Sequence, residues 1–376
     1  MVILLQVQIN IVLSILLIIL LGHAYFNINR KKATNRLFIG IIALTCFTLI
    51  LEIVSVLLNN PNLKQFIVLH KLVNIAGFIV APCIAFLGYL LIKEWVNRYQ
   101  TEKIKVNNIL ILLLVVNAIG TLISYNGSGI FYVTSESVYE RGPLFFISPC
   151  VSYIFLGYAL YFIYKQRKKL ANSELVIFSL FYIVPALFTS IQLKYPVYLT
   201  TWNSAAIVIV ITYIFILNDQ ACRDSMTGLE NRLAYEHYAQ NIKYKQINKL
   251  FIIYMDIDEL KTINDQYGHH EGDKAIKTFA NLLFESFPLR KKKLIRLGGD
   301  EFLILLKEQH QEKVMCYIRN LIQHVEAYND REKKAYRLGF SYGIVCGANA
   351  SESIHKLVEY ADQLMYKQKQ SRKSNI

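Results

Sequence analysis

Two acidic clusters in the C-terminal part have residue types and spacing suited to metal-assisted chemistry. Gly298-Gly299-Asp300-Glu301 interrupts an apolar run that resumes at Phe302, and Asp256-Ile257-Asp258 ends a run that begins at Leu250. Glycine permits a tight turn and the close approach of a ligand, so the first cluster is typical of a hairpin tip. Carboxylates at two strand ends can hold Mg²⁺ and indicate phosphoryl chemistry. For the tetrapeptide taken alone, an ordinary hairpin turn is the less favoured alternative.

The alternation of apolar and mixed segments predicts the elements that must position these clusters. Strands are expected over 250–256, 293–297, 302–307 and 337–345. Helices are expected over about 227–240, 262–285, 311–329 and 353–370. This order favours an α/β (α+β) sandwich, in which helices cover a mainly antiparallel sheet.

From Asp224 to its end, the chain resembles the GGDEF family of diguanylate cyclases. Five blocks match in the family's order: Asp224–Arg232, Asp256–Asp273, Gly298–Phe302, Ser341–Ile344, and Ala361–Tyr366 followed by Lys369. Met226 and Leu260 stand where the family usually has leucine and phenylalanine. The resemblance implies the palm-like fold of nucleotidyl cyclases and polymerases, with both acidic clusters side by side at the sheet edge.

The resemblance also implies a metal site and a catalytic carboxylate. Asp256 and Asp300 would ligate Mg²⁺ (or Mn²⁺) through their side chains, and Ile257 through its backbone carbonyl. Glu301 would lie near the attacking hydroxyl, as a base or a metal ligand. Asp258 is expected to be a structural hydrogen-bonding residue.

Substrate contacts are implied at further matching positions. Asn264 and Asp273 would read the guanine edge, because an amide and a carboxylate accept from its N1–H and N2–H donors. The phosphates would be held by Lys261, Lys369 and Lys373. Gly298 and Gly299 would let the backbone approach the nucleotide.

Two departures from the family pattern carry expectations of their own. Family members that are inhibited by their product have an Arg-x-x-Asp pair, and here its two positions are Leu289 and Lys292. The usual inhibitory site is therefore expected to be absent. Arg372-Lys373 replaces the usual Gly-Arg after the closing lysine, so the chain departs from the family at a position expected to bind phosphate.

The N-terminal part has the composition of a membrane region. Seven apolar segments approach or exceed the length that crosses a bilayer core of about 30 Å. They are 3–26, 37–58, 66–92, 106–125, 144–164, 174–193 and 199–217. A buried soluble helical core is the alternative. The span count and the outer segment 125–143 resemble the seven-span sensor region of some histidine kinases.

Charges in the connecting loops set the expected orientation. The chain has a formal net charge of +14, and 16 basic residues accompany only six acidic ones before residue 218. Basic residues gather at 30–36, 93–105 and 165–169, which places those loops in the cytoplasm, the N-terminus outside and the C-terminal domain inside.

The sequence has no basic stripe interleaved with aromatic residues, so it does not indicate nucleic-acid binding. Glu52, His70 and Lys71 lie toward the outer ends of spans, either as functional groups or as side chains that reach the interface.

The sequence predicts three parts: a transmembrane sensor or anchor over 1–217, a linker or signalling helix over 218–223, and a cyclase domain over 224–376. The predicted function is condensation of two GTP molecules into cyclic di-GMP with release of two pyrophosphates. Condensation requires a homodimer, and the bilayer and an unknown sensed ligand are the other expected partners. A seven-span receptor whose domain only binds GTP and regulates a partner is the alternative, and a transporter with a regulatory domain is a weaker one.

Overall fold

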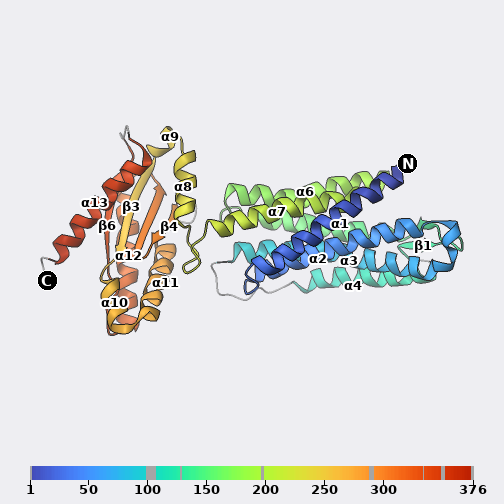
Figure 1. The fold of residues 1–376 in the computed structure, drawn as a ribbon, viewed down its shortest axis with the longest axis horizontal. Helices are drawn as coiled ribbons and strands as arrows, with labels where there is room; N and C mark the ends of the chain where they lie inside the picture. The colour runs from blue at the N-terminus through green and yellow to red at the C-terminus, as the bar shows by residue number, and fades with distance from the viewer. Residues whose placement is uncertain are drawn as a thin grey trace. The chain divides into compact units, whose positions relative to one another are not determined.

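The computed structural model describes residues 2–98, 107–127, 129–195, 199–287, 292–332, 334–348 and 352–373. The chain divides into two compact units, Met1–Phe215 and Ile216–Ile376. Figure 1 shows that the first unit is built mainly from helices and that the second combines a sheet with helices.

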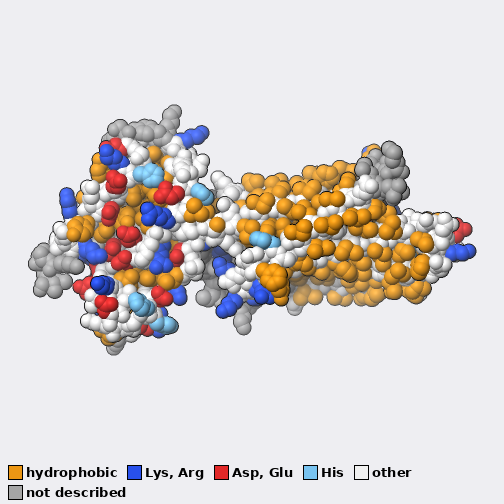
Figure 2. Space-filling view, in the orientation of Figure 1, with side chains coloured by type: hydrophobic (Ala, Val, Ile, Leu, Met, Phe, Trp, Pro, Cys, Tyr) orange, Lys and Arg blue, Asp and Glu red, His pale blue; other side chains and the backbone are white. Residues whose placement is uncertain are grey.

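Helices make up most of the first unit. They are α1 (Val2–Asn27), α2 (Ala33–Leu58), α3 (Ile67–Val96), α4 (Asn108–Ile123), α5 (Ile147–Lys165), α6 (Asn172–Lys194) and α7 (Thr201–Ala221). In the described part of the chain, seven helices are long and apolar enough to cross a membrane, as the sequence predicts. Hydrophobic side chains cover most of the face of this unit seen in Figure 2.

Short elements connect these helices at one end of the first unit. The 3₁₀ helix η1 (Pro61–Phe66) joins α2 to α3, and η2 (Ser124–Asn126) follows α4. The strands β1 (Phe131–Val133) and β2 (Tyr139–Arg141) then form an antiparallel hairpin. Its residues Phe131 and Val133 are buried in a cluster with Ile75 of α3, so the hairpin packs against the bundle.

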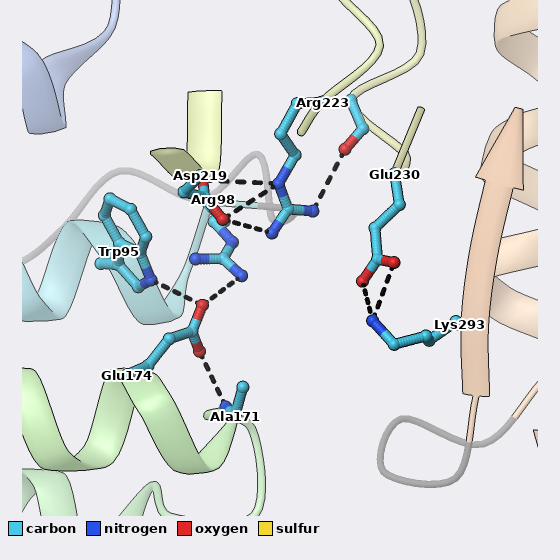
Figure 3. A network of polar contacts seen from close by, with 9 residues as sticks. Trp95, Arg98, Ala171, Glu174, Asp219, Arg223, Glu230 and Lys293 are labelled. Atoms are coloured by element: carbon cyan, nitrogen blue, oxygen red, sulfur yellow. Dashed lines mark hydrogen bonds and ion pairs between the residues drawn. The ribbon is translucent and has the colours of Figure 1, made fainter. Parts of the chain in front are cut away.

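A buried carboxylate joins α3 and α6 within the first unit. Glu174 Oε1 accepts hydrogen bonds from Trp95 Nε1 (3.0 Å) and from an Arg98 guanidinium nitrogen (2.8 Å), as Figure 3 shows. Its other oxygen accepts from the backbone N–H of Ala171 at 2.8 Å. These donors satisfy a buried charge that would otherwise destabilise the unit.

The second unit contains a four-stranded antiparallel sheet with the order β4-β5-β3-β6. Its strands are β3 (Leu250–Ile257), β4 (Lys292–Gly298), β5 (Glu301–Lys307) and β6 (Phe340–Cys346). Its helices are α8 (Arg232–Asn241), α9 (Tyr244–Ile247), α10 (Leu260–Tyr267), α11 (His269–Ser286), α12 (Gln311–Glu332) and α13 (Ile354–Lys373).

The central strand β3 is buried on both faces. Alternate residues of a strand point to opposite faces. Ile253 and Met255 join a core with residues of α11 and α12, whereas Ile252 and Tyr254 join a core with residues of α13. Asp256 therefore belongs to the face that α13 covers.

Two of the expected helices have different boundaries. The helix expected over 227–240 begins at Arg232, because Asp224 Oδ1 accepts from the Thr227 N–H (2.8 Å) and hydroxyl (2.6 Å) and holds the preceding segment in a turn. The helix expected over 262–285 is two helices, divided at Gly268. Gly268 has a φ of +83°, which lies outside the helical range and suits a residue without Cβ.

Candidate functional site

The two acidic clusters meet at one end of the sheet. The antiparallel register of β3 and β5 places Asp256 directly opposite Glu301. Directly opposed residues share a face of the sheet, so both belong to the face that α13 covers. The N–H of Ile257 donates to the Asp300 carbonyl oxygen at 3.2 Å and joins the end of β3 to the hairpin tip. The structure thus brings together Asp256, Ile257, Asp300 and Glu301.

A lysine from α13 pairs with the first cluster. Lys369 Nζ forms an ion pair with Asp256, which is only 8% exposed. Burial raises the pKa of Asp256 to about 6. The hydrogen bond from Lys369 lowers this pKa, whereas the nearby charge of Asp300 raises it further. Burial alone would lower the pKa of Lys369, but its hydrogen bond to Asp256 makes the net shift upward. Negative charge is therefore concentrated in this cluster, and the ammonium group of Lys369 partly offsets it.

The donor set of this cluster fits a hard divalent cation. Within the described ranges, no three His, Cys, Asp or Glu side chains already converge on one point as they would in a closed metal site. Mg²⁺ does not require such a cage, since it commonly binds one or two carboxylates and takes further oxygens from substrate phosphates and water. Asp256 and Asp300 would supply the carboxylates. Burial, and after it the charge of Asp300, raises the pKa of Asp256, and a bound cation would offset both effects.

Tyr254 lies two residues before Asp256 on β3, on the same face of the sheet as the opposed carboxylates Asp256 and Glu301. Burial, followed by the charge of Glu301, raises the pKa of Tyr254. The sequence alone does not indicate this residue, because a tyrosine within an apolar strand is indistinguishable from a core residue.

Arg296 organises the glycine turn, although no motif in the sequence indicates this role. Gly299 has a left-handed φ of +48°, and the pairing of β4 with β5 shifts register between Arg296 and Gly298. The Arg296 guanidinium donates to the Gly299 carbonyl oxygen through Nε (3.0 Å) and Nη2 (2.8 Å), and to Asp224 Oδ1 through Nη1 (3.1 Å). Burial tends to raise the pKa of Asp224, but the hydrogen bonds from Thr227 and Arg296 outweigh burial, so this pKa is lowered.

The segment that contains Asp224 also pairs with the edge strand β4. Glu230 N–H donates to the Leu294 carbonyl (3.0 Å), and Arg296 N–H donates to the Glu230 carbonyl (2.8 Å). The Glu230 side chain pairs with Lys293 Nζ at 2.9 Å, as Figure 3 shows. The segment Asp224–Arg232, here called the opening motif, is thus part of the scaffold of the hairpin formed by β4 and β5.

The two residues expected to read guanine come from α10 and α11. Asn264 lies on α10, and its Oδ1 packs so closely on Gly272 of α11 that a Cβ there would be 1.9 Å away. Asp273 is the next residue. Gly268, between the helices, lets the chain fold back and place Asn264 beside the segment that carries Asp273.

The expected phosphate-binding lysines differ in their surroundings. Lys261 is exposed on α10, and Lys369 pairs with Asp256. The side chain of Lys373 lies outside the described residues. Its neighbour Arg372 donates to the Phe340 carbonyl oxygen at 2.6 Å and so anchors the end of α13 to β6.

Asp258 and Lys292 have structural contacts. Asp258 Oδ1 accepts from Ser341 Oγ at 2.7 Å, in agreement with its expected structural role. Lys292 Nζ donates to the carbonyl oxygens of Phe284 (2.7 Å) and Phe287 (2.8 Å) at the end of α11. Burial lowers the pKa of Lys292 to about 8. Leu289, the other position of the inhibitory pair, lies outside the described residues.

The match to a known protein family falls within the second compact unit. The family described as "Diguanylate cyclase, GGDEF domain" matches residues 221–375. The uncharacterized protein YhcK of Bacillus subtilis is 31% identical over 166 residues, which are 42% of this chain and 45% of that protein. The probable diguanylate cyclase DgcJ of Escherichia coli is 34% identical over 159 residues, 40% of this chain and 30% of that protein.

A solved structure that comprises only the GGDEF domain of a Pseudomonas aeruginosa protein is also similar. It is 24% identical with a TM-score of 0.35, and the match covers 40% of this chain and 89% of that one. The chain spans less than half of the length of the two curated relatives.

Proposed function

We propose that this chain, whose residues 221–375 are a GGDEF domain, is a membrane-anchored diguanylate cyclase that condenses two GTP molecules into cyclic di-GMP and two pyrophosphates. The observation that supports this most strongly is the opposed pair Asp256 and Glu301, with Asp300 at the adjoining hairpin tip. The name of the relative DgcJ, a probable diguanylate cyclase, agrees with it.

The reaction joins the 3′-hydroxyl of one GTP to the α-phosphorus of the other, and pyrophosphate leaves. Asp256, Asp300 and the Ile257 carbonyl would hold a divalent cation, whose positive charge would offset the charge developing on the phosphates. Glu301 accepts a hydrogen bond from the attacking hydroxyl and receives its proton. The turn at Gly299 lets the backbone approach the phosphates.

Two copies of the chain must meet for the reaction to occur. Each domain offers one guanine-reading pair, Asn264 and Asp273, and the product contains two guanines. Two facing domains therefore form one complete catalytic centre. The helical unit brings two copies together in the membrane and responds to a signal.

The membrane assignment rests on the seven long apolar helices and on the basic loops between them. It places the N-terminus outside and the GGDEF domain in the cytoplasm, where GTP is available. A reporter fused after residue 62 should be external, and one fused after residue 218 should be cytoplasmic. An external signal from the second fusion would contradict the orientation.

The test uses the full chain, purified in detergent and incubated with GTP and Mg²⁺. Formation of cyclic di-GMP is measured by chromatography, with Glu301→Ala as the inactive reference and ATP as the rejected substrate. Binding of GTP without any product would contradict the cyclase assignment and favour a GTP-binding receptor that regulates a partner.

A further inference from the structure

A cavity in the first unit lies beyond the GGDEF domain and the proposed chemistry. It measures about 480 Å³ and is lined by residues of α2, α3, the β1–β2 hairpin, α6 and the start of α7. This size lies within the range of small-molecule sites in proteins, about 300–1,000 Å³. The cavity therefore has room for a small molecule.

Two ionisable side chains of opposite type line this cavity, and within the described residues neither forms an ion pair. Glu52 accepts from the side-chain amides of Asn10 (2.8 Å) and Gln192 (3.5 Å), and in the described part of the chain no cation pairs with it. The exposed Arg141 donates to the carbonyl oxygens of Leu193 (2.9 Å) and Gln192 (3.3 Å), and no described carboxylate pairs with it. A charge that has only neutral partners in an apolar bundle retains a strong attraction for an opposite charge.

One residue fixes the spacing of these charges. Gln192 contacts Glu52 through its side-chain amide and Arg141 through its backbone carbonyl oxygen. The carboxylate and the guanidinium are therefore linked through one glutamine and a hydrogen bond at each of its ends. A ligand that contacts both must carry a positive and a negative group several bonds apart.

The surroundings of Glu52 and Arg141 suit a ligand with an apolar middle, and the cavity has access to water near Arg141. A second cavity of about 200 Å³, lined mainly by apolar side chains, shares Phe78 and Trp202 with the first. Arg141 is exposed on the hairpin, so the charged end of a ligand can enter from the aqueous side. Thr201 and Trp202 begin α7, the helix that precedes the GGDEF domain in the chain.

We infer that this cavity binds a small water-soluble zwitterion, with its cationic group at Glu52, its anionic group at Arg141 and an apolar chain between them. The bidentate guanidinium suits a carboxylate or a phosphate, and Glu52 suits an ammonium group. Binding at the first turn of α7 gives the helical unit a chemical signal to sense.

The test measures the fluorescence of the full chain in nanodiscs of phosphatidylglycerol, a lipid without a zwitterionic headgroup. Trp202 lines both cavities, and Trp95, the other tryptophan, is held by Glu174. The probes are 6-aminohexanoate, hexylammonium and hexanoate, which share one apolar chain and differ in their charged ends. A saturable change is expected with 6-aminohexanoate, and it should be lost in Trp202→Phe.

Binding of either singly charged probe should be about tenfold weaker, because each lacks one charge-assisted contact. Glu52→Gln should reduce the affinity for 6-aminohexanoate to that for hexanoate. Arg141→Met should reduce it to that for hexylammonium. Arg141 is exposed, so its variant keeps the test decisive even if Glu52→Gln does not fold.

Two matched controls lie outside the cavity lining. Glu140→Gln removes an acid beside Arg141 that pairs with Tyr132, and Lys71→Met removes a cation that donates to the Tyr125 carbonyl oxygen. Neither should change the affinity. A flat signal with all three probes, or an equal loss in the control variants, would overturn the inference. Because the readout is binding, this result is independent of whether the GGDEF domain makes cyclic di-GMP.

Discussion

Asp224 and Arg296 form an ion pair, 3.1 Å between Oδ1 and Nη1, although 72 positions separate them in the chain. The same guanidinium holds the carbonyl of Gly299, so the opening motif supports the glycine turn through a single side chain. The two side chains are 20% and 10% exposed, which shields the pair from water. Arg296 is thus a positioning residue for the acidic tip.

Replacing Arg296 by methionine should lower kcat by up to about a hundredfold, because a small misplacement of reacting groups has effects of that order. The KM for GTP should change little, since Arg296 contacts Asp224 and Gly299 rather than Asn264 or Asp273, the residues proposed to read guanine. Loss of the charged hydrogen bonds should also cost about 1.5–3 kcal/mol of stability. Arg337→Met is the control, because Arg337 and Asp330 are 70% and 73% exposed. Equal effects of the two variants on kcat would contradict the positioning role.

The change Glu301→Gln should lower kcat by roughly 10²–10⁴-fold, the usual contribution of a group that transfers a proton. The fold should persist, because Gln has the same size and removes a charge from a crowded cluster. Purified protein is assayed for cyclic di-GMP and for Tm. Glu312→Gln, on the exposed first turn of α12, is the matched control. Undiminished synthesis by the Glu301 variant would remove this residue from the catalytic centre.

The close contact of Gly272 with Asn264 provides a test of guanine recognition. An added Cβ would lie 1.9 Å from Asn264 Oδ1, so Gly272→Ala must displace the amide. We expect a KM for GTP that is raised about tenfold or more, since a lost hydrogen bond leaves polar groups unpaired. Gly157→Ala is the control, because nothing lies within 4 Å of its added Cβ. An unchanged KM would argue against Asn264 as a base-reading residue.

The raised pKa of Asp256 predicts how its charge affects stability without metal. Its pKa is about 6 in the folded protein against an ordinary 3.8, so the folded state binds this proton more tightly than the unfolded state. The negative charge therefore costs stability as pH rises from about 4 through 6, and the cost is absent below that range. In chelator, Asp256→Asn should raise Tm above pH 6 and leave it unchanged below about pH 4.

Mg²⁺ should stabilise the wild type above pH 6, where Asp256 is ionised, and should stabilise Asp256→Asn much less. Thermal unfolding with and without Mg²⁺ measures both effects. Asp330→Asn, at a side chain that is 73% exposed, should show neither. A Tm difference that is independent of pH would show that Asp256 does not titrate in this window.

The contacts of Lys292 predict that product does not inhibit the enzyme at the family's usual site. Its ammonium is already bound to the carbonyl oxygens of Phe284 and Phe287. The initial rate should stay constant as cyclic di-GMP is added, whereas a Leu289→Arg, Lys292→Asp variant should gain sensitivity. Lys292→Met should reduce stability by about 1.5–3 kcal/mol without changing the response to product. Strong non-competitive inhibition of the wild type would reveal another product site.

The sequence by itself determined the features that depend on local pattern. Apolar runs of sufficient length indicate the helices of the first unit, because a bilayer-spanning helix needs about 20 consecutive apolar residues. The four strands of the second unit were predicted closely, since each is a short apolar run bounded by turn or charged residues, whereas the short strands β1 and β2 were not predicted. The carboxylates at 256 and 300–301 were selected because they interrupt such runs.

Only the tertiary structure decided which distant residues become partners. Lys369 and Asp256 are 113 positions apart, and Glu52 and Gln192 are 140 apart, so no local period could pair them. The late start of α8 follows from the turn that Asp224 forms with Thr227, and the break between α10 and α11 lies at Gly268, which has a positive φ. A helical pattern in the sequence does not show where a turn or a tertiary contact will end the helix. The turn at Asp224 is stabilised by Arg296, which lies 72 positions later in the chain. The sheet register and the packing of helices, rather than any local pattern, bring these groups within bonding distance.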